Sequence, residues 1–99
     1  MDMISILVAD DHGIVREGLR RLLDGEEDLQ VSGEAGDGRE VLEQVAHNQP
    51  DVVVLDISMP RLGGLETLEQ LRASHPNIKV ILLSVHSDPS FIQSAISLG

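Results

Sequence analysis

Short apolar runs alternate along the chain with segments whose apolar residues recur at helical spacing, and this alternation constrains the fold more than any other feature. The runs predict four strands, at residues 4–9, 30–35, 51–57 and 78–85. The segments between them have the spacing of amphipathic helices, as in Leu65, Leu68 and Leu71. A fourth helix is expected after Asp88 and Pro89, a capping residue followed by a helix-initiating proline. Strands that alternate with helices in this way predict an α/β fold, with a parallel sheet covered on both sides.

The composition excludes several classes of function. The 99 residues suffice for a single domain, 1–99, and there is no cysteine for a disulfide, a thiolate metal site or a cysteine nucleophile. A net charge of −10 repels phosphate backbones and anionic lipid, so we do not expect this segment to bind nucleic acid or a membrane surface. The apolar runs are too short to cross a bilayer and no signal peptide is visible, so the expected location is the cytoplasm.

Aspartates stand at the ends of two predicted strands. Asp10 and Asp11 follow the first strand, and Asp56 closes the third. If these two strands are neighbours, as in the doubly wound order 2-1-3-4, the three carboxylates converge at one edge of the sheet. Three anions this close repel one another, and a hard divalent ion such as Mg²⁺ removes that conflict. A carboxylate beside such an ion can act as a nucleophile toward phosphorus.

Each of these residues also has a simpler interpretation. Asp11 alone has about even odds of being a helix N-cap, and Asp56 alone could be a polar strand end. His12 is more readily interpreted as a solvated loop or cap residue than as a metal ligand, because it lacks the paired spacing of a zinc site. The combination of Asp10 and Asp11 with Asp56 is much harder to explain by capping, and it favours a site.

The same residues resemble the receiver domains of two-component response regulators. The resemblance is carried by the segments ILVADDH at 6–12, VVVLDISMP at 52–60 and VILLSV at 80–85. The Asp-Asp-His opening and the segment GLRRLL at 18–23 are most similar to the NarL/FixJ branch of transcriptional regulators. This resemblance implies a flavodoxin-like (CheY-like) fold that accepts a phosphoryl group from a sensor histidine kinase.

Site residues follow from the resemblance position by position. Asp56 corresponds to the phosphoacceptor, Asp11 to a direct Mg²⁺ ligand and Asp10 to a ligand that acts mainly through water. The backbone carbonyl of Ser58 corresponds to the family's main-chain metal ligand. Ser84 corresponds to the switch hydroxyl that turns toward the phosphoryl group on activation.

One departure from the family pattern concerns the C-terminal end. Receiver domains carry a phosphoryl-binding lysine on a fifth strand, whereas the single lysine here is Lys79, at the beginning of the fourth. By that pattern the chain stops at Gly99, before strand five, the last helix and any helix-turn-helix module that binds DNA. We therefore expect an open sheet edge that favours a homodimer or a domain-swapped oligomer. We also expect Mg²⁺ binding but inefficient phosphorylation.

Three functions remain in competition. The first is a phosphoaccepting receiver, which is not an enzyme beyond catalysing its own phosphorylation and dephosphorylation. The second is a phosphorylation-independent interaction module, a pseudo-receiver, which the missing lysine keeps open. The third is a Mg²⁺-dependent aspartyl phosphohydrolase; it is disfavoured because Ser58 stands where the haloacid-dehalogenase-like enzymes need a second aspartate.

Overall fold

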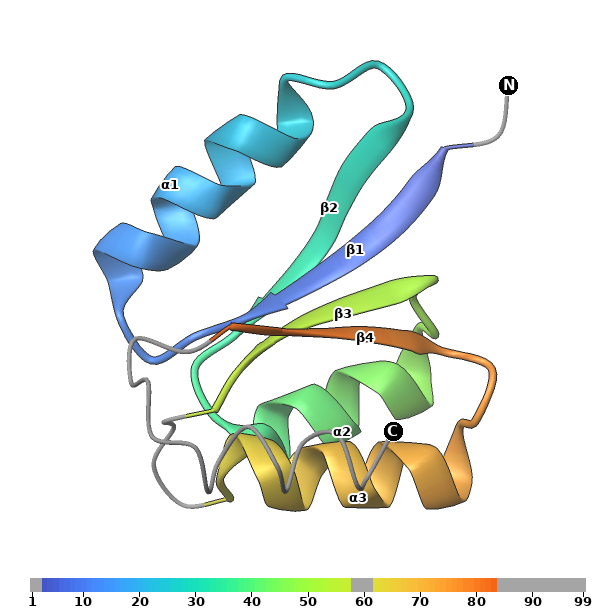
Figure 1. The fold of residues 1–99 in the computed structure, drawn as a ribbon. Coiled ribbons are helices and arrows are strands. Elements are labelled where there is room, and N and C mark those ends of the chain that lie inside the picture. Colours follow the sequence, from blue (N-terminus) through green and yellow to red (C-terminus); the bar gives the residue numbers. More distant parts are fainter. Residues whose placement is uncertain (1–2, 58–61, 84–99) are drawn as a thin grey trace.

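The computed structural model describes residues 3–57 and 62–83, and the predicted helix after Asp88 lies outside them. Strands and helices alternate throughout this part of the chain, as the sequence predicts (Figure 1). The elements are β1 (Ile4–Ala9), α1 (Gly13–Asp24), β2 (Leu29–Ala35), α2 (Gly38–His47), β3 (Val52–Asp56), α3 (Gly64–Ser74) and β4 (Lys79–Leu83). Among the described helices, none has the length and apolar character that a bilayer crossing requires.

The four strands form one parallel sheet in the order β2-β1-β3-β4, which confirms the predicted order. Strand β1 is central and pairs with both β2 and β3. Its last residue, Ala9, lies opposite Ala35 of β2 and Leu55 of β3, so these strands end at the same edge of the sheet. The residues that follow β1 are therefore brought beside the end of β3, although more than forty positions separate them in the sequence.

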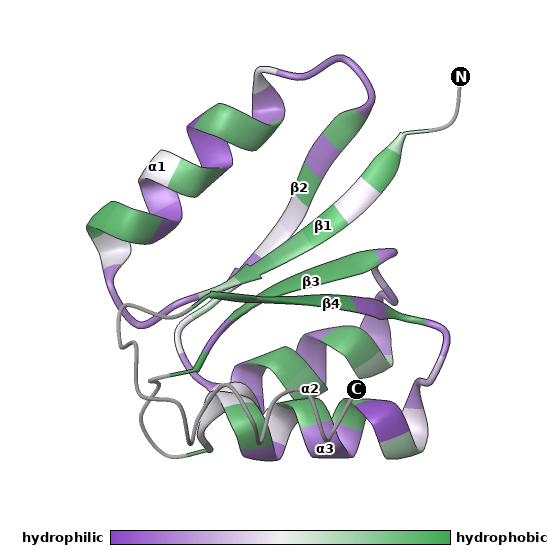
Figure 2. Cartoon of the chain, in the orientation of Figure 1, coloured by the Kyte–Doolittle hydropathy of each residue, from purple (hydrophilic) through white to green (hydrophobic). Residues whose placement is uncertain are grey.

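Helices α2 and α3 lie on one face of the sheet, and α1 lies on the other (Figure 1). The larger core lies between the sheet and the α2–α3 layer. Figure 2 shows that β1 and β3 are hydrophobic along most of their length, while each helix has both hydrophobic and hydrophilic residues. The buried members of this core are Leu7, Ala9, Ala35, Val41, Val45, Val53, Leu55, Leu68, Leu71 and Ile78.

Helix α1 packs against its face of the sheet through a small apolar contact. Leu19 and Leu23 are partly buried against the sheet residues on that side, and no residue of α1 is fully buried. Val15 and Leu22 recur at the same helical spacing in the sequence, but they lie largely outside this contact. Val15 is 42% exposed and Leu22 is 72% exposed, so the contact of α1 with the sheet is confined to its second half and to Leu19 and Leu23.

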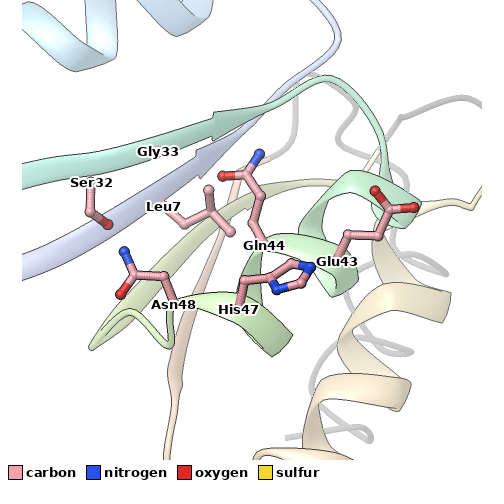
Figure 3. Close-up of a pocket in the computed structure, with 7 residues that line it drawn as sticks. All are labelled: Leu7, Ser32, Gly33, Glu43, Gln44, His47 and Asn48. Carbon is pink, nitrogen blue, oxygen red and sulfur yellow. The ribbon is translucent and has the colours of Figure 1, made fainter.

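A cavity of about 230 Å³ lies between β2 and the second half of α2. Ser32 and Gly33 border it from the strand, and Gln44 and His47 border it from the helix (Figure 3). The absence of a side chain at Gly33 leaves room for the Gln44 side chain, because a β-carbon at this position would collide with it. The Gln44 amide donates a hydrogen bond to the backbone carbonyl of Glu34 (2.6 Å) and so covers part of the outer edge of β2.

Candidate functional site

The three aspartates singled out in the sequence converge where β1 and β3 end, as predicted. One side-chain ligand atom from each of Asp10, Asp11, His12 and Asp56 lies within 4.8 Å of the others. Asp10 and Asp56 are each only 4% exposed, whereas Asp11 lies at the surface. We call this group of four residues the acidic cluster.

Backbone hydrogen bonds hold the two buried aspartates in place. The Asp10 N–H donates to the carbonyl of Ala35 (3.0 Å), which ties the start of the β1–α1 loop to the end of β2. On the other side of the cluster, the N–H of Ile57 donates to the Leu83 carbonyl (3.0 Å) and fixes the residue that follows Asp56. Both carboxylates are thus attached to the rigid sheet rather than to a free loop.

Helix α3 begins directly against the backbone of Asp56. The N–H of Gly64, its first residue, donates to the carbonyl of Ile57 (3.0 Å). A β-carbon at Gly64 would lie only 2.5 Å from the Ile57 α-carbon and closer still to the Asp56 carbonyl oxygen. Glycine at this position therefore allows the helix to approach Asp56 more closely than any other residue would.

His12 belongs to the acidic cluster, and the sequence did not predict this role. Its backbone N–H donates to Asp10 Oδ1 (2.7 Å), and its ring Nδ1 lies 3.0 Å from Asp10 Oδ1 and 2.9 Å from Asp11 Oδ1. The hydrogen bond with Asp10 and the charge of Asp11 raise the pKa of the imidazole above its ordinary value. His12 is also exposed and is the N-cap residue of α1, which confirms its interpretation as a solvated loop or cap residue and shows that Asp11 is not that N-cap.

The donor set fits a hard divalent cation. Carboxylate oxygens are the preferred ligands of Mg²⁺, and three of them meet here, two on almost fully buried residues. Burying several anions together is costly unless a positive charge is close by. When protonated, the His12 ring adds a positive charge beside these carboxylates, and Asp10, Asp11 and Asp56 are the residues that would hold the ion.

Two predicted site residues, Ser58 and Ser84, lie outside the described residues. Lys79 is where the sequence predicts it to be: it is exposed and pairs with Val52 at the beginning of β3. Asp56 stands at the other end of that strand, so Lys79 does not belong to the acidic cluster.

Arg16 is a second residue whose place the sequence did not reveal. Its position on α1 suggests a residue on the solvent side, yet its side chain is only 28% exposed. The guanidinium Nη1 donates to the backbone carbonyl of Asp10 (2.8 Å). No local pattern predicts this contact, because it depends on how α1 is oriented relative to the end of β1.

Comparison with known proteins identifies the family. Residues 6–99 match the family described as the response regulator receiver domain. The chain is 44% identical over 97 residues to the response regulator GacA of Pseudomonas aeruginosa, covering 98% of this chain and 45% of GacA. It is 36% identical over 96 residues to the transcriptional regulatory protein DegU of Brevibacillus brevis, covering 97% of this chain and 41% of DegU. The chain thus spans less than half the length of these relatives.

Solved structures agree with this assignment. The signal receiver domain of the putative response regulator NarL from Mycobacterium tuberculosis superposes with a TM-score of 0.92 at 33% identity, over 100% of this chain and 80% of that one. The relatives of the present chain belong with the NarL/FixJ, or LuxR-type, regulators. The sheet order of the chain is that of the CheY-like fold. With its acidic cluster at the end of β1 and β3, the chain belongs to the receiver domain family of two-component response regulators, which are regulatory phosphoacceptors rather than enzymes.

Proposed function

We propose that Asp56 accepts a phosphoryl group from a sensor histidine kinase and that Asp10, Asp11 and Asp56 hold the Mg²⁺ ion that this transfer needs. The observation that supports this proposal is the meeting of these three carboxylates within 4.8 Å, with Asp56 at the end of a central strand. Any of the three could bind a cation, but Asp56 is the one fixed between β4 and the start of α3.

The transfer requires one bond to form and one to break. An oxygen of the Asp56 carboxylate attacks the phosphorus atom of a phosphohistidine, and the phosphorus–nitrogen bond breaks as the imidazole leaves. Mg²⁺, when bound, neutralises charge on the phosphoryl oxygens. Asp10 and Asp11 contribute the negative charge that attracts the ion, and the backbone bonds around Asp56 keep its carboxylate oriented for attack.

The remaining roles in this proposal rest on the family resemblance. The Ser58 carbonyl completes the metal site, and the Ser84 hydroxyl turns toward the phosphoryl group once Asp56 is modified. The relatives include a protein named as a transcriptional regulator, and this chain covers only 41% of it. We therefore propose that phosphorylation controls transcription through a C-terminal helix-turn-helix module that contacts DNA, as the resemblance implies.

Labelling with a small phosphodonor tests the proposal. The chain is incubated with acetyl phosphate and Mg²⁺ to the end point, and the modified residue is located by mass spectrometry. We expect one phosphoryl group, removed by hydroxylamine as an acyl phosphate is, and its loss in Asp56→Asn or when Mg²⁺ is chelated. Asp51→Asn is the matched control: Asp51 stands at the opposite end of β3, where its carboxylate accepts hydrogen bonds from Ser5.

The outcomes separate the three functions considered above. Labelling of the wild type and of Asp51→Asn, but not of Asp56→Asn, supports the receiver function. A label that persists in Asp56→Asn, or no label in any variant, contradicts it, and the second result favours a phosphorylation-independent interaction module. Repeated turnover of a phosphate ester would instead support a phosphohydrolase.

A further inference from the structure

Arg16 joins three segments that meet beside the acidic cluster. Its Nη1 donates to the backbone carbonyl of Asp10 (2.8 Å), and its Nε lies 3.7 Å from Glu34 Oε1 near the end of β2. The same guanidinium lies against the β2–α2 loop, since a β-carbon built on Gly36 would be 3.3 Å from Nη1. One side chain of α1 thus contacts the β1–α1 loop, β2 and the loop that follows β2.

Among the described residues, the first half of α1 has no other anchor of this kind. Of residues 11–18, Arg16 is the one that is not exposed, and Ile14 is 88% exposed. The apolar contacts of α1 with the sheet begin only at Leu19. The loop that carries Asp10 and Asp11 is therefore held by the backbone bond from Asp10 to Ala35 and by the charged hydrogen bond from Arg16, while this half of α1 buries little apolar surface.

We propose that Arg16 is a positioning residue for the metal site. The Asp10 peptide is held at both ends, because its N–H donates to Ala35 and its carbonyl accepts from Arg16. With the backbone fixed in this way, the Asp10 carboxylate accepts the His12 N–H (2.7 Å) and stays within the acidic cluster. This inference rests on the proposed function, since it assumes that the cluster binds Mg²⁺.

The geometry also explains why arginine suits this position. A guanidinium directs several N–H groups along fixed directions, so it can donate to the Asp10 carbonyl and still face Glu34. A lysine ammonium would supply the charge but not the two fixed directions. Glu34 is also held by Arg20, whose Nη1 lies 3.0 Å from Glu34 Oε2. Arg20 therefore shares the contact with Glu34, whereas within the described part of the chain the bond to the Asp10 carbonyl comes from Arg16.

Three arginine variants of equal charge change form the test. Arg16→Gln removes the bond to Asp10 together with the ion pair to Glu34. Arg20→Gln removes the contacts with Glu34 and Asp24 but leaves the Asp10 bond, and Arg21→Gln removes an exposed pair with Glu17. Mg²⁺ affinity is measured by calorimetry on each variant, and stability by urea unfolding. We expect about tenfold weaker Mg²⁺ binding in Arg16→Gln, the lower end of what is lost with a partner that orients a ligand. The two control variants should bind Mg²⁺ like the wild type.

A second readout needs no metal. Backbone amide hydrogen exchange at Asp10 and His12 reports whether the loop is held, and both amides should exchange about tenfold faster in Arg16→Gln than in Arg20→Gln. Arg16→Lys is the second variant, used if Arg16→Gln does not fold. It retains the charge but not the two fixed N–H directions, and we expect an Mg²⁺ affinity between those of the wild type and Arg16→Gln.

The outcomes distinguish this inference from the proposed function. The positioning role would be overturned if Arg16→Gln matched Arg20→Gln in both Mg²⁺ affinity and amide exchange. If Arg16→Gln is unfolded, the same comparison is made with Arg16→Lys. Absence of Mg²⁺ binding in the wild type would instead refute the proposed metal site, and the amide exchange would then still decide whether Arg16 holds the loop.

Discussion

Replacing Gly64 by alanine should destabilise the fold, although alanine is the better helix former. The added β-carbon would lie 2.5 Å from the Ile57 α-carbon and 3.0 Å from the Asp56 carbonyl carbon, and nearest of all to the Asp56 carbonyl oxygen. All three are backbone atoms, so no side chain can rotate to make room. Either α3 or the end of β3 must move.

The expected magnitude follows from two opposing effects. Overpacking a well-filled site costs about 1–3 kcal/mol, and the gain from better helix propensity is below about 1 kcal/mol. That gain is smaller still at Gly64, because this residue is the first of α3. We therefore expect a net loss of roughly 1–2 kcal/mol in the free energy of unfolding.

Gly18 provides a matched control for the same chemical change. It lies inside α1, and nothing stands within 4 Å of a β-carbon built there. Gly18→Ala should therefore stabilise the chain by about 0.5–1 kcal/mol, the usual difference between the two residues in an open helix. Two glycine-to-alanine substitutions in helices are thus predicted to have opposite signs.

The free energy of unfolding of both variants is measured by urea titration with circular dichroism. A change of 1 kcal/mol corresponds to about 4–8 °C in Tm for a domain of this size. A phosphodonor assay on Gly64→Ala should also show slower labelling, because the displaced backbone carries Asp56. If Gly64→Ala is as stable as the wild type, or if Gly18→Ala is the less stable of the two, the steric argument is wrong.

Three further predictions concern a cap, the core and a titration. Asp37→Ala should cost about 0.5–2 kcal/mol in urea unfolding, because the Asp37 carboxylate accepts the Glu40 N–H (3.0 Å) at the start of α2, and Asp37→Asn should recover most of that loss. Leu71→Ala should cost about 2–5 kcal/mol, since Leu71 is fully buried, and a loss below 1 kcal/mol would contradict that core assignment. The pKa of His12, raised above 6.5 by its bond with Asp10, should fall toward 6.5 in Asp10→Asn when followed by NMR. An unchanged His12 pKa in Asp10→Asn would refute the assigned cause. Because the pKa is raised in the folded chain, the protonated ring stabilises the fold fully below pH 6.5 and progressively less as the pH rises through the raised pKa.

The sequence by itself determined the order of elements, the parallel sheet and the three aspartates of the cluster. Apolar strands and helical spacing are local patterns, and each can be recognised without knowing what it packs against. The acidic cluster was predictable because parallel strands end at one edge of a sheet, so Asp10 and Asp56 had to lie close together once β1 and β3 were neighbours.

Only the tertiary structure decided which side chains support that cluster. The His12 contacts with Asp10 join residues two positions apart and depend on the conformation of the loop, and the Arg16 contact depends on how α1 is placed against the end of β1. The exposure of Val15 and Leu22 has the same origin, because helical spacing predicts which residues share a face but not how much of that face the sheet covers. The need for glycine at position 64 is likewise invisible in the sequence, since it arises from backbone atoms that meet only when α3 packs against the end of β3.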